Sequence, residues 1–369
     1  MIQNLVIIGA TGKVGKTLIS QIFKREDTNP KIHQNPTRIM GLVSSSTYSY
    51  SPNGLDKHNC NEFITRHKKG EKNLPLEELL EKVNKGSKEN YKTVFVDVTA
   101  SDNMLRLHRH IISETLYGVV TANKLPLIQA DYDTFQKLMS ETERYGYSCS
   151  VMAGAGTINF LRNRRDLRDP VKSISGCFSG TLGYLLSEIS KGIKFSEALQ
   201  LAKDKGYTEP DPREDLSGMD VARKLLILSR TAGINLGIKD VFIEPFIPKE
   251  YFREESVEEF MKASQRLDEY FARNISSALE NQRVPRYVAE MSRDKERPSL
   301  KVSLKEVPIG SPLGTLEGTL NKVVISTKIY PLEEPYSIEA PGAGLSVTAG
   351  NIRADLLEQL NGRRVVNLN

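Results

Sequence analysis

The sequence predicts an α/β protein with two domains, the first built on a parallel sheet and the second of α+β type. A buried strand at the start of the chain runs directly into a glycine turn and a helix, and strands then alternate with helices to about residue 150. Beyond that point the strands alternate polar with apolar residues. The 369 residues are enough for two domains with their own cores.

The first domain is expected to be a parallel sheet covered by helices. Apolar, β-branched runs predict buried strands at 4–8, 38–43, 93–98 and 117–121. A helix is expected at 17–23, a loop rich in Ser, Tyr, Asn and Gly at 44–60, and a charged helix near 76–87. Strands that alternate with helices favour right-handed crossovers and parallel pairing.

The second domain is expected to hold long helices and a partly antiparallel sheet. Residues 172–178 alternate like a strand with one buried face. Helices are expected at 181–191, 196–204 and 219–232, and further strands at 287–289, 300–304 and 322–326. A last amphipathic helix is expected at 346–360.

Composition excludes several classes of function. Lys and Arg number 51 against 46 Asp and Glu, and this +5 is not clustered into a stripe, so no nucleic-acid partner is expected. No apolar run approaches the ~18 residues of a membrane span, and the run at 5–8 is too short for a signal peptide. Three scattered cysteines suit the reducing cytoplasm. None of the five His follows residue 110, which excludes a His-based triad in the later two-thirds.

A glycine turn follows the first strand directly. Gly9, Gly12 and Gly15 are spaced three apart, and glycines there let the backbone turn tightly and approach a pyrophosphate. The next helix directs N–H groups and a partial positive charge at such a group. This order is typical of a Rossmann-type dinucleotide-binding domain; a plain tight turn is the alternative.

The second strand ends without the acidic residue that would hold the ribose 2′-hydroxyl of NAD. Ser44 and Ser45 follow Val43, so hydroxyls that can bind a 2′-phosphate replace a carboxylate that would repel it. The sequence therefore favours NADP(H) over NAD(H).

The most informative segment, residues 206–228, combines carboxylates, two prolines and a lysine. Asp220 and Lys224 are four residues apart on a predicted helix and share one face. A solvated ion pair of small effect is the alternative. Because apolar residues occupy most of this helix, we expect the pair to be buried or to line a cleft, where charges are candidates for catalysis.

The loop before that helix carries further carboxylates. Two prolines stiffen it, so Glu209 is presented from a rigid loop, and Ser217 or Asp215 can cap the helix. A divalent metal cluster of the four carboxylates at 209–215 is less favoured, since no EF-hand pattern is present.

Three other places are candidates for binding or catalysis. Lys124 follows an apolar strand, at the edge where α/β enzymes place functional groups, although a solvated loop lysine is an equal alternative. Small-residue turns at 154–156 and 179–181 could bring backbone N–H groups to a substrate carboxylate, or could simply be turns.

The segment GYTEPDPREDLSGMDVARKLLIL at 206–228 closely resembles the signature of homoserine dehydrogenases. It is most similar to the dehydrogenase module of bifunctional aspartate kinase–homoserine dehydrogenases. The resemblance continues in VDVTAS, VVTANK, CFSGTLGYLLSEI, VPRYVAEM and PGAGLSVTAGNIRADLL, and covers essentially the whole chain.

The resemblance implies a Rossmann-type domain at 1–150, a catalytic and dimerisation domain at 151–340, and a C-terminal helix at 341–369 that returns to the first domain. It implies a cytoplasmic homodimer that reduces L-aspartate 4-semialdehyde to L-homoserine with NAD(P)H, on the route to threonine, methionine and isoleucine. No kinase half or ACT domain is recognised, so feedback by threonine is not expected.

The resemblance also assigns roles to individual residues. It implies catalysis by Lys124, Asp220 and Lys224, with Lys124 as the acid or base. It implies a substrate site formed by Glu209, Asp215, Tyr207, Thr181 and Gly180. It implies cofactor contacts from Gly9, Thr11, Gly12, Lys13, Val14, Gly15, Ser44, Ser45, Thr99, Ala100, Ser101, Gly342 and Gly344.

Several family members hold a monovalent cation with backbone carbonyls. The matching positions are Ser150, Ala153, Ala155 and Thr157. Thr157 and Ile158 replace the usual aliphatic residue and Pro, and Ser150 replaces a frequent Glu, but carbonyl ligands tolerate such changes. The glycine turn also has one residue more than the family's GxGxxG.

Two alternative functions are weighed against this one. An acyl-phosphate-forming semialdehyde dehydrogenase begins with a similar turn but needs a Cys activated by a base, and no His follows Cys149 or Cys177. A non-catalytic NAD(P) sensor would keep the fold without its reactive groups, whereas the lysines and carboxylates are present together.

Overall fold

The computed structural model describes residues 1–65, 71–72, 76–86, 91–293 and 297–360. Its contacts divide the chain into two compact units. Unit 1 contains Met1–Gly154 together with the last segment from Gly344, and unit 2 contains Ala155–Ala343.

Unit 1 is built on a seven-stranded sheet in the order β4-β3-β2-β1-β5-β6-β7. Its strands are β1 (Ile2–Ile8), β2 (Thr37–Val43), β3 (Thr47–Tyr50), β4 (Glu71–Lys72), β5 (Tyr91–Asp97), β6 (Gly118–Thr121) and β7 (Tyr145–Gly146). Pairing is parallel from β2 through β1, β5 and β6 to β7, as the alternation of strands and helices predicts. Because β1 leads to β2 on one side and β5 leads to β6 on the other, the sheet has a switch point between β1 and β5.

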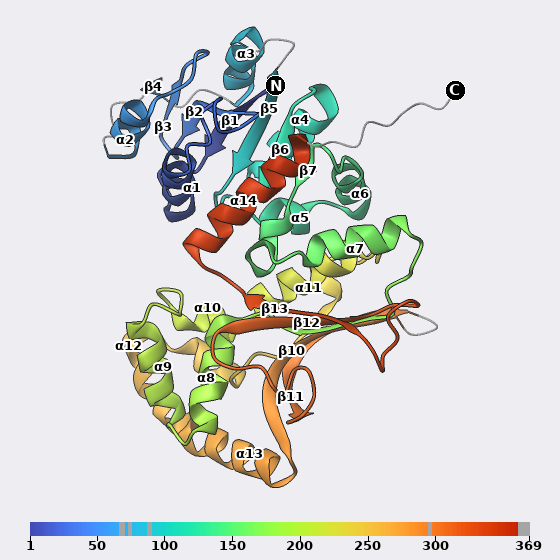
Figure 1. The fold of residues 1–369 in the computed structure, drawn as a ribbon. Coiled ribbons are helices and arrows are strands. Elements are labelled where there is room, and N and C mark those ends of the chain that lie inside the picture. Colours follow the sequence, from blue (N-terminus) through green and yellow to red (C-terminus); the bar gives the residue numbers. More distant parts are fainter. Residues whose placement is uncertain (66–70, 73–75, 87–90, 294–296, 361–369) are drawn as a thin grey trace. The chain divides into compact units, whose positions relative to one another are not determined.

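The helices of unit 1 include one from the far end of the chain. They are α1 (Lys13–Lys24), α2 (Lys57–Thr65), α3 (Leu76–Gly86), α4 (Met104–Glu114), α5 (Leu125–Gln129), α6 (Tyr132–Ser140) and α14 (Leu345–Leu360). Figure 1 shows α14 alongside the elements of unit 1, where it packs on α1. Gln3 at the start of β1 donates to Leu356 O at 2.7 Å and accepts from Arg353 at 3.0 Å. Arg353 also lies 3.2 Å from Asp27, so a buried ion pair anchors α14.

The expectation of a loop at 44–60 is wrong. This segment holds β3, which pairs antiparallel with β2, and the start of α2. Ser44 closes the turn between the strands, because its Oγ accepts from the N–H groups of Ser46 and Thr47. Tyr48 is 2% exposed, so a strand rich in hydroxyl groups still buries an aromatic ring.

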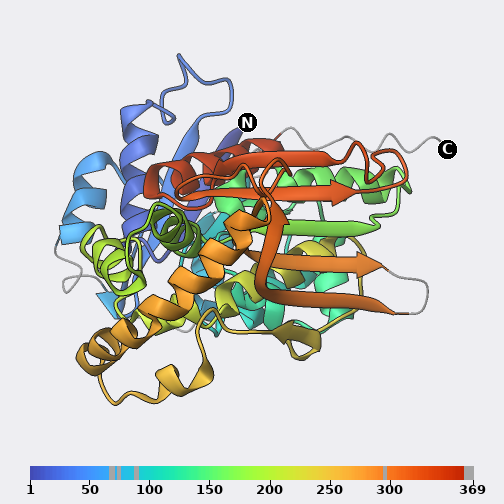
Figure 2. The same cartoon turned by 90° about the horizontal axis from the view of Figure 1, so that it is seen from below.

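Unit 2 is built on a six-stranded sheet in the order β13-β12-β8-β10-β11-β9. Its strands are β8 (Ser173–Cys177), β9 (Val241–Ile243), β10 (Arg283–Arg293), β11 (Pro298–Pro308), β12 (Leu320–Ser326) and β13 (Tyr336–Pro341). Neighbours are antiparallel except β9 and β11, which confirms the α+β expectation. Figure 2 shows the strands of this sheet side by side.

The helices of unit 2 place the candidate residues around β8 and β10. They are α7 (Thr157–Asp166), α8 (Gly180–Ser190), α9 (Phe195–Asp204), α10 (Pro212–Leu216), α11 (Met219–Thr231), α12 (Val257–Ala263) and α13 (Asp268–Glu280), with short 3₁₀ turns between them. Helices α8, α11 and α13 pack on β10. In the described part of the chain, no helix is long and apolar enough to cross a membrane.

Candidate active site

The glycine turn of unit 1 lies between the carboxyl ends of β1, β2 and β5. Gly9 N and Ala10 N donate to Val43 O at 2.9 and 3.0 Å, which ties the turn to the end of β2. A Cβ added at Gly9 would lie 3.0 Å from Thr99 Cγ2, beyond the end of β5. Gly9 has φ +87°, a conformation that glycine adopts without strain.

The start of α1 requires a second glycine and offers N–H groups. A Cβ at Gly15 would lie 2.4 Å from Gly9 O, so only glycine lets the helix begin this close to the turn. No side chain caps α1 at Gly12. Gly12 and Lys13 are exposed, and Thr11 and Val14 are partly buried. A tight backbone cradle at an uncapped helix N-terminus fits a pyrophosphate.

The two serines at the end of β2 differ in their surroundings. Ser44 is 8% exposed, and its Oγ lies 3.0 Å from both Thr47 O and Thr47 Oγ1, within the β2–β3 turn. Ser45 is exposed. Of the two serines, Ser45 is therefore the one that a ligand at the end of β2 can reach.

Two loops at the carboxyl ends of β5 and β6 are joined by a buried polar network. Asp97 accepts from Thr99 N at 2.9 Å and from Asn123 Nδ2 at 3.2 Å. Asn123 Nδ2 also donates to Ser101 O at 2.8 Å. The network therefore connects the segment 99–101 to Lys124, which is partly buried and directly precedes α5.

In unit 2, the predicted pair on α11 is formed. Lys224 Nζ lies 2.8 Å from Asp220 Oδ2 and donates to Phe178 O, just beyond β8, at 2.6 Å. The Lys224 side chain is 11% exposed and that of Asp220 is 44% exposed. The helix thus buries the lysine and leaves the carboxylate partly at the surface.

Asp215 connects three elements at the same end of α11. Its Oδ2 accepts from Glu209 N at 2.8 Å, and its Oδ1 lies 3.0 Å from Thr181 Oγ1 at the start of α8. Thr181 Oγ1 also donates to Tyr207 O at 2.6 Å. Burial is the main cause that raises the pKa of Asp215, with further contributions from Glu209 and Asp220.

The hydrogens around Thr181 can be counted. Tyr207 O can only accept, so it takes the one hydroxyl hydrogen of Thr181. Asp215 Oδ1, at 3.0 Å from the same oxygen, is the second and more distant acceptor of this hydroxyl. The contact with Thr181 lowers the pKa of Asp215, and burial outweighs it.

Family membership follows from comparisons with known proteins. A sequence model described as homoserine dehydrogenase matches residues 157–357. The homoserine dehydrogenase of Saccharomyces cerevisiae is 31% identical over 97% of this chain and 98% of its own length. The chain belongs to the homoserine dehydrogenase family. A bifunctional aspartokinase/homoserine dehydrogenase of Haemophilus influenzae is 32% identical over 97% of this chain, which spans 43% of that relative.

Solved structures share the fold of this family member. A Candida auris protein of unknown function has a TM-score of 0.85 at 27% identity, with 98% of both chains covered. A hyperthermophilic archaeal homoserine dehydrogenase in complex with NADPH has a TM-score of 0.71 at 22% identity, again with 98% of both chains covered. The second likeness concerns the fold, a Rossmann-like domain with a second domain of α+β type.

The residues predicted to form the substrate site lie in unit 2. Tyr207 and Glu209 are exposed on the loop before α10, whereas Thr181 is 6% exposed. A Cβ at Gly180 would lie 3.0 Å from Thr319 O, so this position suits glycine. The expected capping residue differs, because Gly218 takes the N-cap position of α11 with φ +75°. Ser217 Oγ instead accepts from Met219 N at 3.2 Å.

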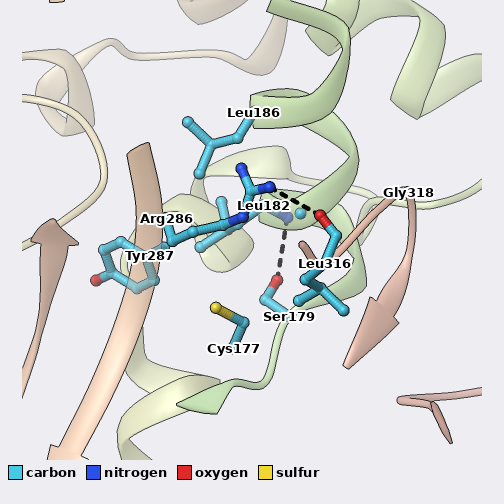
Figure 3. A pocket seen from close by; sticks show the side chains of 9 residues that line it. Cys177, Ser179, Leu182, Leu186, Arg286, Tyr287, Leu316 and Gly318 are labelled. Atoms are coloured by element: carbon cyan, nitrogen blue, oxygen red, sulfur yellow. Dashed lines mark hydrogen bonds between the residues drawn. The ribbon is translucent and has the colours of Figure 1, made fainter. Parts of the chain in front are cut away.

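A small pocket beside α8 contains a buried arginine that the sequence analysis missed (Figure 3). Arg286 on β10 donates to Leu313 O, Gly314 O, Leu316 O and Pro285 O at 2.8–3.1 Å. Among the described residues it forms no ion pair, and burial lowers its pKa. Arg286 therefore holds the β11–β12 connection, and Thr319 at its end contacts the first turn of α8.

The remaining candidates are divided between the units. Gly342 lies in unit 2, where a Cβ would meet the amide of Asn321 at 2.0 Å, and Gly344 lies in unit 1 with φ +134°. Of the cation candidates, Ser150 and Ala153 lie in unit 1, and Ala155 and Thr157 in unit 2. Ala153 O accepts from Asn351 Nδ2 at 2.7 Å.

The cysteines do not suit the alternative semialdehyde dehydrogenase. Cys149 and Cys177 are 7% and 5% exposed. Burial raises the pKa of Cys177 to about 12 and also raises that of Cys149, so both are held as thiols. The comparisons place the chain in another family, and this alternative is set aside.

Sequence reasoning missed the groups behind the site residues. Asp97, Asn123 and His108 are at most 3% exposed and join the two loops of unit 1. Asp97 and Asn123 could have been found from the sequence, because both are polar residues at or just beyond the end of an apolar strand. Nothing in the sequence marks Arg286 as the holder of a distant loop.

Proposed function

We propose that this chain reduces L-aspartate 4-semialdehyde to L-homoserine and oxidises NADPH. The observation that carries the proposal is the buried Lys224, bonded to Asp220 and Phe178 O, within the segment that matches the family. The balance is one aldehyde, one NADPH and one proton, which give one alcohol and one NADP⁺. In a cell this step would serve the biosynthesis of threonine, methionine and isoleucine.

The glycine turn of unit 1 would hold the cofactor. Gly9, Gly12 and Gly15 leave room for a pyrophosphate at the N–H groups of Lys13 and Val14. Thr99, Ala100, Ser101, Gly342 and Gly344 would border the nicotinamide. When bound, the reduced nicotinamide supplies the hydride to the aldehyde carbon.

A preference for NADPH over NADH is part of the proposal. Residues 44–47 after β2 contain no carboxylate, so nothing there repels a 2′-phosphate. The archaeal homoserine dehydrogenase with the same fold holds NADPH, which supports this choice. A kcat/KM that favours NADH by more than about tenfold would reject it.

The lysines and carboxylates would bind the substrate and manage its proton. Lys224 polarises the aldehyde oxygen. Asp220 keeps the Lys224 ammonium group in place and forms a hydrogen bond with the hydroxyl group of the product. Lys124 donates the proton that the oxygen needs. Glu209 binds the substrate ammonium group, and Asp215 orders the loop that presents Glu209 through the bond to its N–H.

The oligomer, the cation and the location complete the proposal. We propose a cytoplasmic homodimer, with unit 2 as the dimerisation unit, and a monovalent cation held by the carbonyls of Ser150, Ala153, Ala155 and Thr157. Light scattering tests the dimer. Activity in potassium, sodium and bulky organic-cation buffers of equal ionic strength tests the cation.

One assay tests the proposed activity against both alternatives. Purified chain is mixed with NADPH and L-aspartate 4-semialdehyde, with and without phosphate, and the product is identified by chromatography. Oxidation of NADPH to give homoserine, independent of phosphate, supports the proposal. Binding of NADPH without turnover identifies a sensor and rejects it.

A further inference from the structure

The polar network at the ends of β5 and β6 lies at the switch point of the unit 1 sheet. Asp97 is the last residue of β5, and Lys124 follows β6 by three residues. Thr99 contacts the glycine turn, since a Cβ at Gly9 would lie 3.0 Å from its Cγ2. Ligands of such sheets bind at the carboxyl edge beside the switch point.

Asp97 is a buried carboxylate surrounded by donors. It is 1% exposed, and its Oδ1 accepts from Thr99 N at 2.9 Å and Thr99 Oγ1 at 2.8 Å. Its Oδ2 accepts from Asn123 Nδ2 at 3.2 Å, and Thr121 Oγ1 lies 3.4 Å away. His108 Nε2, on a residue that is also 1% exposed, lies 3.2 Å from the same oxygen without an aligned hydrogen bond.

Asn123 uses both ends of its amide, and its neighbours fix which end is which. Nδ2 faces the acceptors Asp97 Oδ2 and Ser101 O, at 3.2 and 2.8 Å. Oδ1 faces a donor, Leu125 N, at 3.0 Å. A flipped amide would set its oxygen against two acceptors, so this orientation is the only one that satisfies all three bonds.

These bonds hold the backbone on both sides of Lys124. Before it, Asn123 N donates to Thr121 Oγ1 at 3.0 Å. After it, Leu125 N is bonded to the Asn123 side chain, and the Lys124 carbonyl accepts from Leu127 and Ile128 in the first turn of α5. The Asn123 side chain, which is 3% exposed, therefore bonds the backbone just after Lys124 and ties it to the loop after β5.

We propose that Asn123, held in orientation by Asp97, is a positioning residue for Lys124. Asn123 bonds both the backbone next to Lys124 and the segment 99–101, which lies beside the glycine turn. It thereby holds the proton donor at a fixed distance from that segment. The inference rests on the proposed function only for the role of Lys124 as proton donor. Effective proton transfer needs such a fixed geometry, and a displacement of 1 Å costs about 10²-fold in rate.

Two variants of Asn123 separate its bonds. Asn123→Ser keeps an oxygen that can cap α5 and removes the amide donors to Asp97 and Ser101. Asn123→Asp keeps the shape and brings a second carboxylate against Asp97. The readouts are kcat per NADPH-binding site, with sites counted by NADPH fluorescence, and the NADPH dissociation constant. We expect kcat per site to fall about 10²-fold in both variants and NADPH to bind more weakly.

Gln3→Glu is the matched control. Gln3 is a fully buried amide of the same sheet, at the opposite end of β1, and the change is again amide to acid. We expect it to lower the unfolding temperature and to leave kcat per NADPH site unchanged. Counting NADPH sites removes unfolded protein from the comparison. If Asn123 had only a structural role, its variants would therefore keep the wild-type kcat per site, as Gln3→Glu does.

The outcomes separate this inference from the proposed function. Wild-type kcat per site in both Asn123 variants overturns the inference, and so does failure of both to fold while Gln3→Glu folds. If the wild-type chain binds NADPH but does not turn over the aldehyde, the proposed function fails instead. The inference is then decided by the NADPH dissociation constants, and equal values in both variants and the wild type overturn it.

Discussion

Gly15→Ala is the sharpest test of the glycine turn as a cofactor cradle. The added methyl carbon would lie 2.4 Å from Gly9 O and 2.8 Å from Ala10 Cα, both backbone atoms. The start of α1 must therefore move by about 1 Å away from the turn, at a cost of about 1–3 kcal/mol in folding free energy. This shift misaligns two N–H groups that would bond the pyrophosphate. A loss of about 1 kcal/mol of binding free energy for each bond weakens NADPH binding about 30-fold.

The assay is a titration followed by the fluorescence of NADPH. Gly350→Ala is the control, because its Cβ would meet nothing closer than 3.7 Å within the same unit. Gly350 lies inside α14, so alanine there should stabilise slightly and leave NADPH binding unchanged. An NADPH affinity of Gly15→Ala within about twofold of wild type would show that the glycine turn does not hold the cofactor.

Three further predictions concern unit 2. Lys224→Met leaves the Phe178 carbonyl without its donor and should lower kcat about 10²–10³-fold, measured at saturating NADPH, while a near-normal kcat would remove Lys224 from the mechanism. Asp215→Asn can keep the bond from Glu209 N and donate to Thr181. Because the folded-state pKa of Asp215 is raised, the free energy of unfolding of the wild type falls as pH rises above about 4. Denaturant titrations across pH should show that the variant lacks this fall. Arg286→Lys cannot reach four carbonyls, so the free energy of unfolding should drop by about 1–3 kcal/mol, and an unchanged denaturation midpoint would contradict its role.

The regular elements followed from the sequence because their signals are local. The strand, glycine turn and helix at 2–24 and the helix at 219–231 lie where apolar periodicity and glycine spacing indicated. The β2–β3 hairpin was not predicted, because Ser44 closes it through side-chain hydrogen bonds that the composition does not reveal. The segment was rich in turn-forming residues, and a short strand was hidden among them.

The candidate site was predictable where chemistry-bearing residues are close in sequence. Asp220 and Lys224 are one helical turn apart, and the structure confirms their contact at 2.8 Å. Burial of the lysine alone, rather than of the whole pair, depends on the packing of α11 against β10. Asp97 and Asn123 are 26 residues apart and meet only because parallel strands end at one edge of the sheet.

Transfer of deuterium from cofactor to product is the most direct test of the proposed hydride transfer. NADPH labelled at the transferable position of the nicotinamide is incubated with the purified chain and L-aspartate 4-semialdehyde, and the product is analysed by mass spectrometry. We expect homoserine with a single deuterium on the carbon that was the aldehyde. Unlabelled homoserine, or no homoserine while NADPH remains bound, would contradict it.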